Sequence, residues 1–165
     1  MINEDSLTIQ EWEGAFAQKL FDVIATPRAA KRFSNIYRIL KAPIHHRQLS
    51  QFEGSAEAFG EFQLPMLLLA FLIAQPAEAA IVYPTLYQHA RKGKNFRDSM
   101  SLLKREMGSP SLTPVLERLD PIIASKAFPS DASLLVEWIP RVSRFSFEVG
   151  RAIQKMEPMV KSGSG

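Results

Sequence analysis

The sequence of 165 residues is 46% hydrophobic, contains no cysteine and carries a formal net charge of +3. This length and composition are those of one globular domain, and they exclude a disordered chain, disulfide bonds, thiolate zinc sites and cysteine nucleophiles. A polar N-terminus, and an apolar run at 64–74 that is shorter than the roughly 20 residues of a membrane span, favour a cytoplasmic protein without membrane association.

The N-terminal part of the sequence predicts two helices. Apolar residues at i+4 spacing predict the first helix over 9–24, and Thr8 with Glu11 has the spacing of a capping box at its start. These apolar residues are Trp12, Phe16, Leu20 and Ile24. The second helix is expected over 27–41, with Thr26 as its N-cap and a proline at its first position.

The remaining sequence predicts more short helices, separated by Pro, Gly and Ser. The interval 49–60 has no helical period, and we expect irregular structure there. Further helices are expected over 61–75, 77–83, 84–92, 96–107, 115–127, 130–138 and 145–156. Two of these boundaries rest on prolines, since Pro84 is expected to begin a helix and Pro140 to break one. No alternating apolar pattern predicts a strand, so the fold class is all-α, a compact domain of about seven to nine short helices.

The helices are expected to form a single domain over 1–161. Within it, 8–41 is a two-helix N-terminal unit that carries a basic helix, and 55–161 is the helical remainder. Residues 162–165 read Ser-Gly-Ser-Gly, which is typical of a flexible linker.

Positive charge gathers between Asp22 and Glu53, an interval without any acidic residue. Its basic residues are Arg28, Lys31, Arg32, Arg38, Lys41 and Arg47, with His45 and His46 beside them. On a helical wheel, one face of the 27–41 helix carries Ala29, Phe33, Ile36, Tyr37 and Leu40. The opposite face carries Arg28, Lys31, Arg32, Asn35 and Arg38, interrupted by Ile39. Such a helix anchors itself with its apolar face and presents cations to an anionic partner or to solvent.

Arg28 has an unusual position, because a cation in the first turn opposes the helix dipole at a cost of up to about 1 kcal/mol. A bound anion would offset this cost, since arginine donates two parallel hydrogen bonds and free backbone N–H groups lie nearby. The alternative is that Arg28 lies in solvent or pairs with Asp22 or Glu13.

The segment Thr26–Leu40, TPRAAKRFSNIYRIL, resembles the Pro-Arg-x-x-Lys-Arg-Phe-x-Asn segment of P-loop NTPases of the KAP and related STAND/AAA-like type. In those proteins the segment lies in the helical lid that follows the nucleotide-binding core. The resemblance implies that Arg28 is a sensor-2-type arginine that approaches the terminal phosphates of the nucleotide, and that Asn35 fixes the helix. The implied phosphate-contacting residues are Arg28, Lys31, Arg32, Asn35 and Arg38.

The sequence lacks both the Gly-x-x-x-x-Gly-Lys-Ser/Thr motif and an apolar strand that ends in Asp-Asp or Asp-Glu. We therefore expect no complete catalytic site and no cofactor in this chain alone. The resemblance implies a non-catalytic lid or regulatory domain, with ATP and magnesium bound by the full-length protein. Its implied partner is an N-terminal P-loop NTPase core in cis, and formation of an oligomer is possible.

Two other functions stay open at the level of sequence. A nucleic-acid-binding module would use the same basic helix, and a second basic stripe comprises Arg141, Arg144, Arg151, Lys155 and Lys161. A protein–protein interaction domain would need an exposed apolar patch.

A metal site at His45 and His46 is disfavoured, because His89 is the only other histidine. The acidic residues Glu53, Glu57, Glu61 and Glu78 indicate a mild acidic patch, and the aromatic residues, Phe147 among them, are expected in the core.

Overall fold

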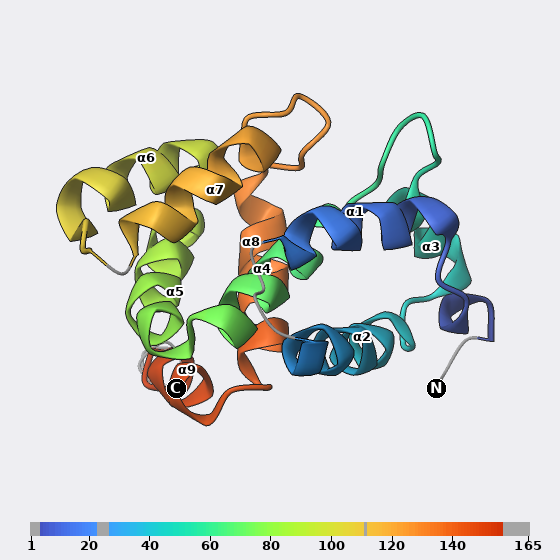
Figure 1. The fold of residues 1–165 in the computed structure, drawn as a ribbon, viewed down its shortest axis with the longest axis horizontal. Coiled ribbons are helices and arrows are strands. Elements are labelled where there is room, and N and C mark those ends of the chain that lie inside the picture. Colours follow the sequence, from blue (N-terminus) through green and yellow to red (C-terminus); the bar gives the residue numbers. More distant parts are fainter. Residues whose placement is uncertain (1–3, 23–26, 111, 157–165) are drawn as a thin grey trace, which may run out of the picture.

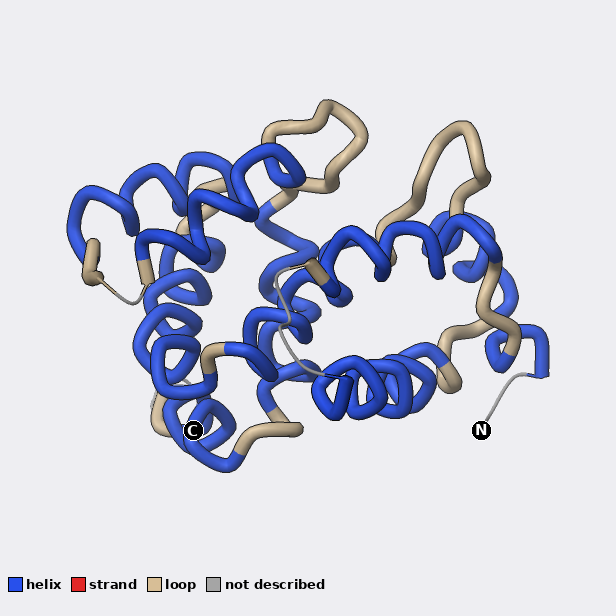
Figure 2. The backbone as a smooth tube through the Cα atoms, viewed as in Figure 1, coloured by secondary structure: helices blue, strands red, loops and turns tan. Residues whose placement is uncertain are grey.

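The computed structural model describes residues 4–22, 27–110 and 112–156. These residues form one short 3-10 helix and nine α-helices without a strand, which confirms the all-α prediction (Figures 1 and 2). In chain order the elements are η1 (Glu4–Leu7), α1 (Glu11–Phe21), α2 (Pro27–Lys41), α3 (His46–Glu53), α4 (Gln63–Ala74), α5 (Pro76–Arg91), α6 (Phe96–Met107), α7 (Thr113–Ile123), α8 (Ala132–Ser143) and α9 (Phe147–Gln154). The predicted cap Thr26 and the linker-like residues 162–165 lie outside the described residues.

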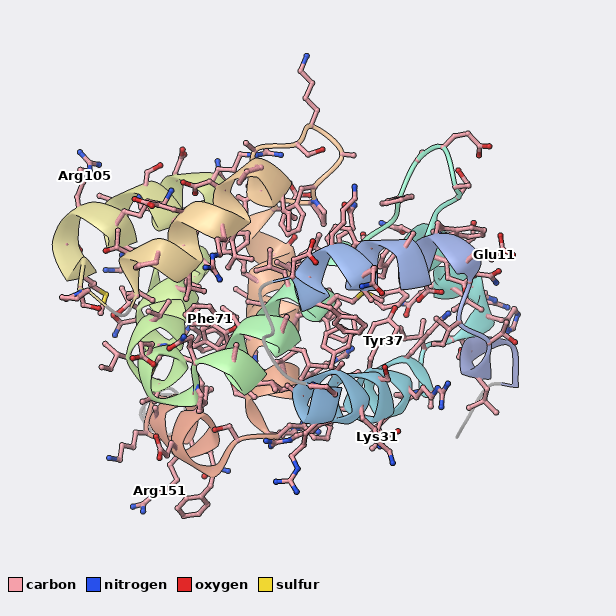
Figure 3. All side chains as sticks on the ribbon, in the orientation of Figure 1. Glu11, Lys31, Tyr37, Phe71, Arg105 and Arg151 are labelled. Atoms are coloured by element: carbon pink, nitrogen blue, oxygen red, sulfur yellow. The ribbon has the colours of Figure 1, made fainter. Side chains whose placement is uncertain are left out.

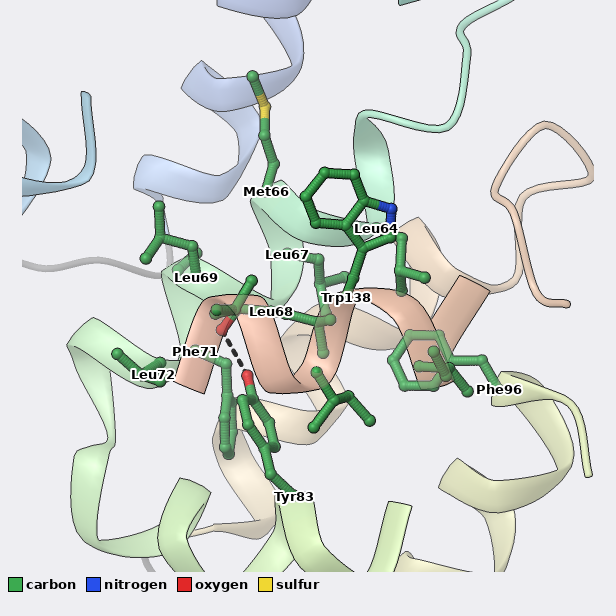
Figure 4. Packing of buried hydrophobic residues seen from close by; sticks show 14 of the residues in the cluster. Leu64, Met66, Leu67, Leu68, Leu69, Phe71, Leu72, Tyr83, Phe96 and Trp138 are labelled. Carbon is green, nitrogen blue, oxygen red and sulfur yellow. Dashed lines mark hydrogen bonds between the residues drawn. The ribbon is translucent and has the colours of Figure 1, made fainter. Parts of the chain in front are cut away.

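Helix α4 is the centre of the fold. Its sequence, QLPMLLLAFLIA, has no polar face, so every side of it must be covered by other helices. Helices α1 and α2 pack on it from one side, and α5 and α8 from the other (Figure 1). In α5, the Tyr83 hydroxyl donates a hydrogen bond to the Leu68 carbonyl of α4, and its ring stacks 5.8 Å from that of Phe71 (Figure 4). No helix in the described ranges is long and apolar enough to cross a membrane.

A buried ion cluster joins α1, α2 and α3. The Lys41 Nζ atom lies 2.6 Å from Glu13 Oε1 and 2.5 Å from Glu53 Oε2, and it donates to the Thr8 carbonyl at 2.6 Å. The Tyr37 hydroxyl donates to the other Glu13 oxygen. The pKa of Tyr37 is raised well above its usual value, first by burial and then by the negative charge of Glu13. Lys41 was counted with the basic residues between Asp22 and Glu53, but it adds no charge to the surface. Its side chain lies at the edge of the apolar face of α2 and meets two carboxylates there.

The same cluster determines where α1 begins. The backbone N–H of Gln10, the N-cap residue, donates to Glu13 Oε1 at 3.0 Å. The predicted capping box of Thr8 and Glu11 is wrong, since α1 starts two residues later than that motif requires. Thr8 instead contributes its carbonyl to Lys41, which ties the segment before α1 to the end of α2.

Helix α3 occupies part of the interval that the sequence predicted to be irregular. It is eight residues long and buries Leu49 and Phe52, which is too short a pattern to establish a helical period. His45 acts as its N-cap, because Nδ1 accepts a hydrogen bond from the Arg47 N–H at 3.2 Å. Gly54 ends the helix with a positive φ of 64°, which disfavours other residues.

Prolines do not interrupt the helices where the sequence predicted. Helix α5 continues through Pro84 and α8 continues through Pro140. A proline removes one backbone hydrogen bond, but both helices bury apolar residues before and after it, so packing holds the two halves in line. Conversely, α7 ends at Ile123, before the predicted 127. The Arg97 guanidinium donates hydrogen bonds to carbonyls at the end of this helix and in the loop after it. These carbonyls belong to Ile123, Ser125 and Phe128.

Candidate functional site

The five predicted phosphate-contacting residues share one exposed face of α2. Arg28, Lys31, Arg32, Asn35 and Arg38 are all exposed, and we call them the basic face. The opposite face of the helix is buried through Phe33, Ile36, Tyr37 and Leu40. Figure 3 shows Lys31 pointing away from the molecule, whereas Tyr37 points inward between α1 and α2. The sequence pattern therefore predicted correctly which side of this helix meets solvent.

Most of the positive charge on the basic face is not neutralised by neighbours. Within the described ranges, Arg28, Lys31 and Arg38 form no ion pair. Asp22 and Glu13 were the two possible partners of Arg28 in the sequence. Glu13 instead pairs with Lys41 in the buried cluster. Three cations are thus left available to an anion from outside the described chain.

Two members of the basic face differ from the rest. The Arg32 guanidinium donates to the Phe145 carbonyl at 3.1 Å, which holds α2 against the connection between α8 and α9. The Asn35 side chain is exposed and forms no hydrogen bond with the described residues, so it does not fix α2 against a described neighbour as the resemblance implied.

The first turn of α2 contains Arg28 and no acidic side chain. The positive end of the helix dipole and the guanidinium therefore act together on any negative group placed there. From Arg28 to Arg38 the face extends about 15 Å, given a rise of about 1.5 Å per residue. This span could contact several phosphate groups.

Among the described residues, the second predicted basic stripe follows α8, the connection after it and α9. Arg144 follows α8 directly, beside Phe145, and so lies near the basic face. Arg141 instead lies 4.9 Å over the Trp138 ring, and Arg151 lies 5.5 Å over the Phe147 ring. Lys161 lies outside the described residues.

Phe147 is 77% exposed, so its predicted place in the core was wrong. It stands in the first turn of α9, whose buried side is formed by Val149 and Ile153.

The described residues do not bring potential metal ligands (His, Asp or Glu) together in a group of three or more. His45 and His46 lie side by side with ring centroids 4.3 Å apart, without a third ligand. The predicted acidic patch is divided, since Glu53 is buried with Lys41 whereas Glu57 is exposed.

A groove of ≈ 840 Å³ lies between the end of α2 with α3 on one side and α8 on the other. We call it the α2–α8 groove. Its apolar lining includes Ile39, Leu40, Phe52, Leu134, Trp138 and Phe145. One signal of this groove is visible in the sequence, the apolar Ile39 on an otherwise polar helix face. The groove itself depends on segments about 90 residues apart that only the folded chain brings together.

Comparison of the chain with protein-family models, with curated proteins and with solved structures finds no match in any of the three.

Proposed function

We propose that this chain is a non-catalytic helical domain that binds phosphate groups through the basic face of α2. The carrying observation is that Arg28, Lys31 and Arg38 are exposed on one side of a helix whose other side is in the core, and that no described carboxylate pairs with them. A fixed helix with uncompensated cations is already arranged for an anion, so little ordering is needed on binding.

The more specific form of the proposal is a lid or regulatory domain of a P-loop ATPase. In this form Arg28 contacts the terminal phosphates of ATP bound to a core elsewhere in the full-length protein, and the domain relays the nucleotide state to a partner or effector domain. The supports are the resemblance of Thr26–Leu40 to the KAP/STAND segment and the exposure of Arg28 in the first turn of α2. Arginine at that place stabilises charge that develops on the transferred phosphoryl group.

The test is ATP hydrolysis by the full-length protein, wild type against Arg28→Ala. Arg105→Ala is the matched control, because Arg105 is also an exposed helical arginine but lies on α6 (Figure 3). We expect Arg28→Ala to lower turnover at least about tenfold, equivalent to about 1.4 kcal/mol, and Arg105→Ala to leave it unchanged. Equal turnover in all three proteins would refute the lid role.

A second candidate function is nucleic-acid binding, favoured by the extent of the charge. Arg144 lies near the basic face, so the positive surface exceeds what one nucleotide requires. This function predicts binding of labelled duplex DNA that weakens steeply with salt, with a slope of about −0.9 per phosphate contacted. Arg38→Ala should then reduce the slope by about one contact. No salt-sensitive binding at low ionic strength would exclude it.

A further inference from the structure

The α2–α8 groove is a surface distinct from the basic face. One wall is α8, whose twelve residues extend about 18 Å, or roughly three helical turns. The other wall consists of the last turn of α2, the connection after it and α3, which contribute Ile39, Ile44 and Phe52. At the floor, Phe52 and Trp138 bring the two walls together, with ring centroids 5.6 Å apart. The α8 wall is therefore long enough for about three turns of a second helix to lie along it.

The lining of the groove includes an exposed apolar side chain. Ile39 is 59% exposed, although it belongs to a helix that otherwise presents charged and polar residues to solvent. Single exposed apolar residues are common, but this one shares the groove with the partly buried Leu134 and Phe145. Together they form an apolar strip that a second apolar surface would remove from water.

The charges along the groove differ between its two ends. Towards the N-terminal half of α8 the lining residues are Asp131 and Glu137, and towards its C-terminal end they are Arg141 and Arg144. Glu61 joins the acidic end. Its pKa is raised by burial, opposed by a hydrogen bond from Gln51, and raised further by the charges of Glu137 and Asp131.

Three of these five charges form no ion pair with the described residues, whereas Glu137 and Arg141 pair with each other. In the described chain neither Glu61 nor Asp131 forms an ion pair. Arg141 and Glu137 pair at 3.3 Å with both side chains about half exposed. Such surface pairs contribute little stability and exchange readily for an incoming group. A ligand with cations at one end and carboxylates at the other would complement the groove along its length.

We propose that the α2–α8 groove docks an amphipathic helix of a partner protein, lying antiparallel to α8. Its apolar side covers Ile39 and Leu134, the basic residues of its last turn meet the acidic end, and the acidic residues of its first turn meet Arg141 and Arg144. This direction is consistent with the partner helix itself, because acidic first turns and basic last turns match the helix dipole. Grooves of this kind recognise helices through apolar anchors at i, i+3 and i+4 spacing.

Glu61 and Asp131 at one end, together with Glu137 in the middle of α8, disfavour a nucleic acid in the groove, because their carboxylates would repel its phosphates. The groove and the basic face can therefore serve different partners. The proposed helix requires neither Arg28 nor a nucleotide.

The test uses synthetic helical peptides of about four turns, with one shared apolar face, titrated into the chain at low ionic strength. The first peptide carries Glu in its first turn and Lys in its last turn. The other two carry Lys at both ends or Glu at both ends. Binding is measured by fluorescence anisotropy, and the site is mapped by chemical-shift changes at the backbone amides of Leu134 and Trp138.

Two variants distinguish binding in the groove from nonspecific binding of the peptide to apolar side chains elsewhere. Ile39→Asp places a charge in the groove, whereas Ile81→Asp makes the same change at a side chain of α5 that is 60% exposed and does not line it. Thermal unfolding establishes first that both variants fold.

We expect the Glu-first, Lys-last peptide to bind at least tenfold more tightly than either single-charge peptide. Ile39→Asp should weaken its binding at least tenfold, and Ile81→Asp should change it less than twofold. The proposal is overturned if no peptide binds, if all three bind alike, or if the two variants weaken binding equally.

Discussion

Replacing Lys41 by methionine tests whether the buried ion cluster holds the N-terminal helices together. The substitution keeps a long apolar chain but removes an ammonium group that has three acceptors at 2.5–2.6 Å. Glu13 is fully buried and Glu53 is 8% exposed, so two carboxylates would remain without their cation in a poorly hydrated place. Breaking a buried pair in this way costs about 3–5 kcal/mol, a large share of the roughly 5–15 kcal/mol by which a domain is stable.

Urea unfolding followed by circular dichroism measures this cost. With a slope of about 2 kcal/mol per molar urea, the unfolding midpoint of Lys41→Met should fall by about 1.5–2.5 M. Lys31→Met is a matched control, because Lys31 lies on the same helix but points into solvent (Figure 3). An exposed substitution of this kind should change the free energy of unfolding by no more than about 0.5 kcal/mol.

A second substitution distinguishes charge from packing. In the Lys41→Met background, Glu53→Gln removes one of the two unpaired carboxylates, so the double variant should recover part of the lost stability. If Lys41→Met costs less than about 1 kcal/mol, or no more than Lys31→Met, the cluster does not stabilise the fold as argued.

Three further predictions use the same unfolding assay. Gly60→Ala should lower the free energy of unfolding by about 2–3 kcal/mol, because the added Cβ would come within 3.0 Å of backbone atoms of Phe52. Gly14 lies in α1 with open space around it, so Gly14→Ala should instead raise the free energy of unfolding by about 0.5–1 kcal/mol. Burial raises the pKa of Glu61 in the folded chain. The contribution of Glu61 to stability is therefore present below its pKa in the unfolded chain and is lost as pH rises through its pKa in the folded chain. Glu61→Gln should reduce this pH dependence and raise the free energy of unfolding at neutral pH, and a lower free energy of unfolding at neutral pH would contradict this. Burial also raises the pKa of Tyr83 well above 10.0. This tyrosine therefore loses its proton first in the unfolded chain, and stability falls above about pH 10. Tyr83→Phe should make the fall of stability with pH shallower there, and an unchanged fall would speak against this reasoning.

Elements with a strong local pattern were predictable from the sequence. Helix α6 has its predicted bounds, since Phe96, Met100 and Leu103 repeat at helical spacing and Gly108 follows directly. The bounds of α2 and its division into two faces were also correct, because one proline begins it and a clear apolar stripe runs along it.

Features that depend on distant residues were not predictable in the same way. Pro84 and Pro140 are tolerated because of what packs on both sides of them, which a local rule cannot include. Lys41 resembles its basic neighbours in sequence, and its burial follows from Glu13 and Glu53 on two other helices. For the candidate site, the exposed cations of α2 were predictable, whereas the α2–α8 groove was not.

The burial of α4 from Gln63 to Leu72 also affects how binding can be detected. Because α1 and α2 cover one side of this helix and α8 another, its backbone amides reach solvent only when the whole domain opens. Hydrogen–deuterium exchange at Met66–Phe71 therefore reports the global free energy of unfolding. Any ligand that binds the native chain, on the basic face or in the groove, raises that free energy by RT ln(1 + [L]/Kd). The same few amides would thus register both kinds of partner, although neither partner would touch them.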